Sequence, residues 1–264
     1  MAGRAMWRAA VEFGQVRVLV KMYAAVREQR VQFHLLHDKD KVRLQQQWVC
    51  ELENKPVDRE EVVRGAQVDD EKYVVLESDD LKGLEPETSR SIEVTAFVKA
   101  DEIDARYCDH PYYLGPDGQD EHYAALAKVL HDSGMGGLCQ WTVRKRSYTG
   151  LLRCTGGPLE LVTLRTAAEV RAVKELSLPE AKVSPREQKT AEYLVNELSA
   201  PFQPAEHRDE FTQALQDLVQ AKAAGKKIPA RRAARKPAVA PDRLLDTLEK
   251  SVAAAQKARK KHAA

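Results

Sequence analysis

The chain has 264 residues, of which 43% are hydrophobic and 31% charged, with a formal net charge of +2 at pH 7. This length fits one large domain, or one domain with a small appendage, and the apolar share is enough for a buried core. No run of about 18 uncharged apolar residues occurs, which argues against a membrane-spanning helix. Arg4, Arg8 and Glu12 interrupt the stretch where an export signal needs apolar residues, so we expect a cytoplasmic protein.

The sequence offers little support for a metal, a cofactor or an enzymatic site. Its cysteines (Cys50, Cys108, Cys139 and Cys154) are widely spaced and form no Cys-x-x-Cys pair, which agrees with a reducing compartment. His34, His37 and Cys50 are too few for a tetrahedral site, and position 54, where another cysteine would complete one, is Asn54. No glycine-rich phosphate loop follows an expected strand. We therefore expect no metal, no cofactor and no catalytic activity.

The small net charge conceals three charge clusters. Residues 51–121 carry 21 acidic and 8 basic side chains, whereas residues 222–264 carry 13 basic and 3 acidic ones. An acidic body with a basic tail favours a polyanionic partner for the tail, although a merely solvated tail remains an alternative. The third cluster is basic and lies in a region of expected strands: Arg144, Lys145, Arg146, Arg153, Arg165, Arg171 and Lys174.

Alternating apolar residues predict strands in the first part of the chain. Val16, Val18 and Val20 alternate with more polar neighbours, as do the apolar residues of 92–98. The short apolar run at 73–76 also predicts a strand. A helix is expected to begin at 78, with Ser78 as its cap.

The middle of the chain predicts one helix followed by antiparallel strands. Tyr123, Leu126, Ala127 and Leu130 recur at helical spacing within 122–132. Residues 138–144, 151–154 and 159–164 then predict strands joined by tight turns.

After residue 179 the pattern becomes helical. Ser184 and Glu187 form a capping box around Pro185, and a further helix is expected from about 206 to 224. Residues 226–240 are a basic linker, and the stripe Leu244, Leu245, Leu248 and Val252 predicts one short amphipathic helix. These patterns divide the chain into a core at 1–180, a helical part of the core at 181–225, and a basic, largely flexible tail at 226–264.

Several segments, in order along nearly the whole chain, resemble the prokaryotic Ku family, the DNA-end-binding factors of bacterial non-homologous end joining. They are the opening Trp7 to Tyr23, the block Phe33 to His37 with Arg43 and Cys50, the block Arg90 to Pro116, and the segment Pro201 to Gly225. Ala9 and Leu19 depart from the family pattern, which usually has glycine and proline there. Asn54 stands where some members carry a second cysteine.

The resemblance implies an α+β fold, with a β-barrel core and an extended β-arm that forms a ring in a two-fold homodimer, followed by C-terminal helices and a basic tail. With this arm in view, we expect the strands of 151–164 to form an arm hairpin whose apolar face needs a partner surface. It also implies the partners, which are double-stranded DNA ends, a second copy of the chain, and a multifunctional ATP-dependent DNA repair ligase, in a nucleoid-associated protein. A ring that accepts any broken end should contact phosphates rather than bases. An architectural DNA-binding protein acting through its basic tail remains the alternative.

These expectations assign candidate residues to two tasks. DNA contacts are expected from Arg144, Lys145, Arg146, Arg153 and Arg165 of the body, and from Lys226, Lys227, Arg231, Arg232, Arg235 and Lys236 of the tail. Docking of the ligase is expected from the apolar stripe Leu244, Leu245, Leu248 and Val252, by a helix-in-groove contact.

Overall fold

A computed structural model describes residues 3–70, 72–87, 89–173, 176–177, 183–225 and 247–253. The described residues divide into two compact units. The first unit comprises residues up to 28 together with 33–173, and the second comprises 29–32 together with the described residues after 173. The division predicted from the sequence, at residues 180 and 225, remains a prediction.

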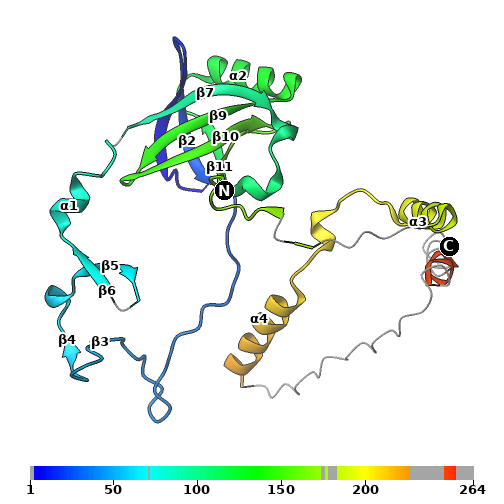
Figure 1. Ribbon diagram of the computed structural model, residues 1–264. Coiled ribbons are helices and arrows are strands. Elements are labelled where there is room, and N and C mark those ends of the chain that lie inside the picture. The colour runs from blue at the N-terminus through cyan, green and yellow to red at the C-terminus, as the bar shows by residue number, and fades with distance from the viewer. Residues whose placement is uncertain are drawn as a thin grey trace. The chain divides into compact units, whose positions relative to one another are not determined.

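Seven strands of the first unit form a closed barrel in the order β1-β2-β8-β11-β10-β9-β7 (Figure 1). Their bounds are β1 (Trp7–Phe13), β2 (Val16–Ala24), β7 (Ser91–Lys99), β8 (Cys108–Pro116), β9 (Met135–Val143), β10 (Arg146–Cys154) and β11 (Leu159–Leu164). Neighbouring strands run antiparallel except β1 and β7, which are parallel. The predicted β-barrel of an α+β protein is thereby confirmed.

The barrel interior is filled by the side chains on one face of each strand. Val18 and Val20 of β2 and Ile92 of β7 are buried, as the period of two predicts. Helix α2 (Asp120–Ser133) packs against the barrel through Leu126 and Leu130, which are four residues apart and so share a helix face. The predicted helix at 122–132 is confirmed, and Gly134 ends it in the left-handed conformation, with φ of 63°.

The predicted arm hairpin at 151–164 is wrong. Both of its strands, β10 and β11, belong to the barrel, because β10 also pairs with β9 and β11 also pairs with β8. Their apolar residues are buried inside the same chain, so this hairpin needs no partner surface: Leu151, Leu152, Leu159, Leu161 and Val162.

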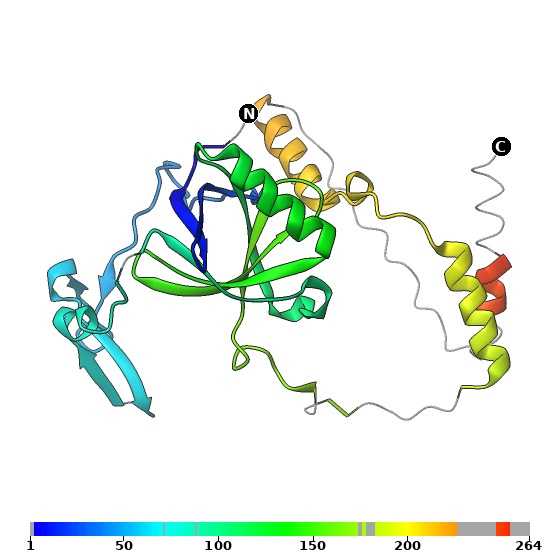
Figure 2. The same ribbon diagram turned by 90° about the horizontal axis from the view of Figure 1, so that it is seen from above.

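The excursion from the barrel is instead the connection between β2 and β7, whose residues 33–90 we call the arm (Figure 2). It carries two small antiparallel sheets and one short helix: β3 (Trp48–Val49) with β4 (Pro56–Val57), β5 (Arg64–Asp69) with β6 (Lys72–Leu76), and α1 (Ser78–Lys82). The strand predicted at 73–76 is confirmed. Helix α1 begins at Ser78 as predicted, but its cap is Glu77, which forms a capping box with Asp80.

The second unit contains α3 (Pro185–Leu198), α4 (Glu210–Ala223) and a helical segment at 247–253. Ser184 and Glu187 form the predicted capping box of α3, and Asp209 caps α4 by accepting from the amide of Thr212. No residue of α3 or α4 is buried.

Short 3-10 turns lie in both units, at Arg59–Glu61, Ala100–Glu102, Ala105–Tyr107 and Pro204–Glu206. Among the described helices, none is both long and apolar enough to cross a membrane.

Candidate nucleic-acid interface

A tight turn between β9 and β10 presents three basic residues to solvent. Arg144 and Lys145 occupy its two central positions with φ of 50° and 67°, and Arg146 begins β10 opposite Val143. Two positive φ values define the hairpin turn that Asn-Gly normally fills. An L-residue with a side chain costs roughly 1–2 kcal/mol in this conformation. The chain therefore keeps two cations at a place where Asn and Gly would give a more stable turn.

Within the described residues, the cations of this turn form one exposed ion pair at most. The Lys145 ammonium lies 2.6 Å from the Glu85 carboxylate of the arm, and the Lys145 side chain is still 61% exposed. Exposed pairs of this kind contribute about 0–1 kcal/mol, so Lys145 remains available to a stronger anion. Arg144 and Arg146 are exposed and form no ion pair within the part of the chain that the structure describes.

Arg153 is placed differently from the turn residues. It lies directly opposite Glu160 across the β10–β11 pair, and its Nε donates to the Glu160 carboxylate at 3.0 Å. Thr155 donates to the other oxygen of that carboxylate, also at 3.0 Å. Both charged side chains are partly buried, so this pair ties two barrel strands together. The expected DNA contact from Arg153 remains a prediction, and it would compete with this pair.

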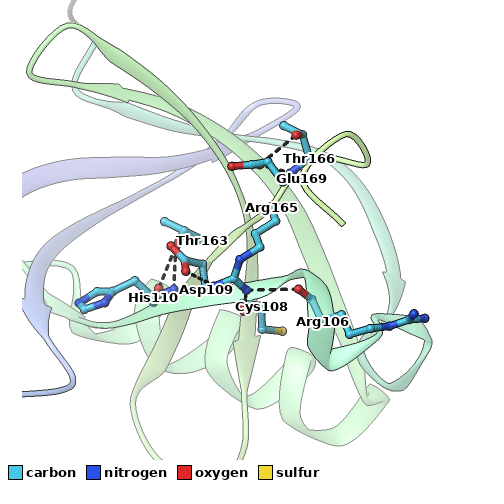
Figure 3. A network of polar contacts seen from close by, with 8 residues as sticks. All are labelled: Arg106, Cys108, Asp109, His110, Thr163, Arg165, Thr166 and Glu169. Atoms are coloured by element: carbon cyan, nitrogen blue, oxygen red, sulfur yellow. Dashed lines mark hydrogen bonds and ion pairs between the residues drawn. The ribbon is translucent and has the colours of Figure 1, made fainter. Parts of the chain in front are cut away.

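Arg165 is the centre of a polar network at the end of β11 (Figure 3). Its guanidinium donates to the carbonyl of Arg106 at 3.2 Å and to the carbonyl of Cys108, and it pairs with the Asp109 carboxylate. Its backbone amide donates to the Tyr107 carbonyl at 2.7 Å. Arg165 thus fixes the end of β11 to the start of β8, and most of its donors are already used.

The same network is supported on both sides along the chain. The hydroxyl of Thr163 accepts from the His110 amide at 2.8 Å and donates to the His110 carbonyl at 3.2 Å. The amide and hydroxyl of Thr166 donate to the Glu169 carboxylate at 2.7 and 2.9 Å, and these bonds lower the pKa of that carboxyl. The chain is therefore held in place as it leaves the barrel.

The sequence did not single out a polar cavity of about 330 Å³ on β7, β9 and β10, close in sequence to the basic turn. Two cross-strand pairs, Thr142 with Ser147 and Gln140 with Thr149, line it with hydroxyl and amide groups, and Glu93 of β7 adds one carboxylate. Such neutral donors commonly contact phosphate and sugar in DNA complexes. In the sequence, polar residues alternate with Trp141 and with Tyr148, and this alternation could have indicated a polar surface here. The two aromatic rings stack with their centroids 5.6 Å apart.

The remaining predicted residues belong to the tail. The basic residues 226–236 and two of the apolar ones, Leu244 and Leu245, lie outside the described residues. Leu248 and Val252 lie in the helical segment at 247–253 and are half-buried. Their predicted roles in DNA contact and ligase docking remain predictions.

The groups considered for other chemistry are placed in ways that do not build a site. His37 pairs with Asp40 at 3.1 Å, and among the described residues no cluster of three or more His, Cys, Asp or Glu side chains is arranged to hold a metal. Cys139 is fully buried in the barrel, and that burial raises the pKa of its thiol to about 12. A thiol with such a pKa is a poor nucleophile.

Comparisons with known proteins cover almost the entire chain. The family model "Ku70/Ku80 beta-barrel domain" matches residues 12–192. Non-homologous end joining protein Ku 2 of Geotalea uraniireducens is 43% identical over 252 residues, 96% of this chain and 98% of the relative. Non-homologous end joining protein Ku of Solibacter usitatus is 35% identical over 98% of this chain and 96% of the relative. Protein Ku of Mycobacterium phage Omega is 36% identical over 86% and 81%. With a closed seven-stranded barrel and near full-length similarity to these proteins, the chain belongs to the Ku family.

Proposed function

We propose that this chain binds the ends of double-stranded DNA without regard to sequence and acts in double-strand break repair by non-homologous end joining. It does so as a ring-shaped homodimer, without catalysis of its own, and recruits and stimulates an ATP-dependent DNA repair ligase. The observation that carries this proposal is the 43% identity, over nearly the full length of both chains, to a protein named for end joining.

The character of the basic turn supports contact with the DNA backbone. Arg144 and Arg146 are exposed cations without ion pairs in the described structure, and the nearby cavity offers hydroxyl and amide groups. Long cations and short hydroxyls bind phosphate oxygens whatever the base sequence. Such contacts make binding strongly dependent on salt, with a slope of log K against log salt of about −0.9 per phosphate contact.

The exposed apolar residues of the arm support the homodimer. Leu52 is 94% exposed, Phe33 73% and Trp48 62% in the single chain. Large apolar residues gathered on one excursion normally indicate an interface, because isolated exposure leaves a hydrophobic surface in water. A two-fold interface between two arms would bury these residues and close a ring.

End dependence is the property that tests the proposal. The protein should bind a linearised plasmid tightly and the closed circular form of the same plasmid weakly, because a closed ring loads only where the DNA has an end. Opening the circle with one double-strand cut should restore binding. Equal affinity for the linear and closed forms would instead support the alternative, an architectural protein acting through the basic tail.

Truncation after Gly225 tests the role proposed for the tail. The truncated chain should still dimerise and prefer ends, while binding longer duplexes less tightly and stimulating ligation less. The physical reason is that residues 226–236 supply six cations for flanking DNA, and the apolar stripe further on supplies the ligase contact. Loss of dimerisation or of loading on short duplexes would show that the tail is part of the ring.

A further inference from the structure

Within the second unit, the helical segment of the tail at 247–253 lies beside α3 (Figures 1 and 2). The guanidinium of Arg186, in the first turn of α3, donates to the Glu249 carboxylate at 3.2 Å. These residues are 63 positions apart in the sequence, so the contact is tertiary. It joins a helix of the second unit to the segment that the sequence marked for ligase docking.

The two helices also share a groove beside the ion pair. A groove of about 370 Å³ lies between the two helices and is lined by Arg186, Lys189, Thr190 and Tyr193 of α3 and by Glu249 and Val252 of the tail. Leu248 and Val252 are both half-buried and are four residues apart, so they share one face of the tail helix. Charge is complementary as well, since Arg186 and Lys189 of α3 border the groove next to Glu249.

We propose that α3 is the intramolecular docking surface of the tail helix, and that a ligase gains the apolar face of that helix only by displacing it from α3. The docking itself rests on the contacts just described. The competition with ligase rests in addition on the proposed function, because it uses the face formed by Leu248 and Val252.

The contact is weak enough for a partner to release the tail helix. The side chains of Arg186 and Glu249 are 74% and 54% exposed, so the ion pair changes the docking equilibrium by only about 1.4- to 5-fold. The covalent connection compensates for this weakness, because two binding groups on one chain meet at an effective concentration in the millimolar range. The observed affinity of an external partner equals its intrinsic affinity multiplied by the fraction of molecules in which the helix is free.

Hydrogen–deuterium exchange on the full-length protein measures the docking directly. A helix of seven residues is not stable alone in water, so amide protection at 247–253 reports contact with α3. Arg186→Glu and Glu249→Arg should each lower that protection about two- to five-fold, and the double variant, which restores opposite charges, should recover it. Arg208→Glu, which makes the same charge change in the second unit outside the groove, should leave protection unchanged.

Two results would overturn the docking: no protection at 247–253 in the unaltered protein, or single reversals whose effects the double variant does not rescue. Competition is tested with a bacterial ATP-dependent end-joining ligase at limiting concentration on a linear duplex. Arg186→Glu should raise ligation two- to five-fold with end affinity unchanged, whereas ligation equal to that of the unaltered protein refutes the competition. Failure of the unaltered protein to bind ends would refute the proposed function, while the exchange result would still decide the docking.

Discussion

At the scale of single residues, Arg144 and Lys145 bring positive charge to the turn but make its backbone less stable. Replacing both residues in the variant Arg144→Asn/Lys145→Gly should stabilise the barrel by about 1 kcal/mol, because these residues favour the positive φ values found there. The same variant should weaken binding to duplex ends and reduce the salt slope by about 0.9 per lost phosphate contact. Urea unfolding and end-binding titrations at several salt concentrations measure the two effects.

A control for this variant is Lys128→Gln, which removes a cation from α2 that is paired with Asp132 at 2.6 Å. It should leave both the salt slope and the affinity unaltered. If the turn variant binds ends as tightly as the unaltered protein, the turn is not part of the DNA interface.

Arg165 gives a second prediction at this scale, since its guanidinium bonds two carbonyls and one carboxylate. Arg165→Lys keeps the charge but cannot reproduce this fork, so it should lower the free energy of unfolding by about 1–2 kcal/mol. Arg106→Lys is the matched control, because within the described residues the Arg106 guanidinium bonds only the exposed Asp104, and it lowers the pKa of that carboxyl to about 2. Chemical denaturation compares them. An equal effect of the two variants would argue against a structural role for Arg165.

The sequence could mark basic residues but not their partners. Arg144, Arg153 and Arg165 look alike in a charge pattern, yet Arg153 faces Glu160 only because of the β10–β11 register. Arg165 reaches Asp109 only because β11 pairs with β8. Both pairings depend on strand register, which a single sequence does not specify, and the second also joins strands that are far apart in the sequence.

At the scale of elements, the meeting of β9 and β10 depends on Gly150. A Cβ at this position would lie 2.6 Å from the Trp141 ring and 2.7 Å from the Val162 carbonyl oxygen. Gly150→Ala should therefore destabilise the barrel by about 1–3 kcal/mol, because neither the packed ring nor the backbone has room to move. Gly157→Ala is the control, since nothing lies within 4 Å of its added Cβ. Equal urea midpoints for the two variants would contradict this account.

Strong periodicity made some elements predictable. β2 and α2 each bury one face, so their patterns specify both the type of element and its inward side. The strands of 151–164 were also predicted, but their assignment to an arm was wrong, because an apolar face does not reveal which sheet covers it. In the arm, β3 and β4 have two residues each, which is too short for any periodic signal.

At the scale of the whole molecule, the arm should determine the oligomeric state. We expect the unaltered protein to have twice the mass of one chain in light scattering at micromolar concentration. Trp48→Ser/Leu52→Ser should be a monomer with weakened end binding, because these two exposed apolar residues would lie in the interface. The fold of the barrel should be unaffected, as shown by amide exchange of β9.

Val129→Ser serves as the control for this experiment, because Val129 is also 62% exposed but lies on α2, outside the arm. This variant should remain a dimer. A dimeric arm variant, or an unaltered protein that is monomeric yet binds ends tightly, would contradict the proposed ring.

The parallel pairing of β1 with β7 has a consequence for how the chain folds. Ala10 pairs with Ser91, so the barrel cannot close until the whole arm has been synthesised and brought back to the first strand. Contacts between residues so distant in the sequence carry a high loop-closure cost and slow folding. During synthesis the apolar side chains of the arm are thus exposed well before the barrel is complete. Pulse-labelling of the nascent chain should find β1 protected no earlier than β9, β10 and β11, and chaperone demand should be concentrated in the interval before barrel closure.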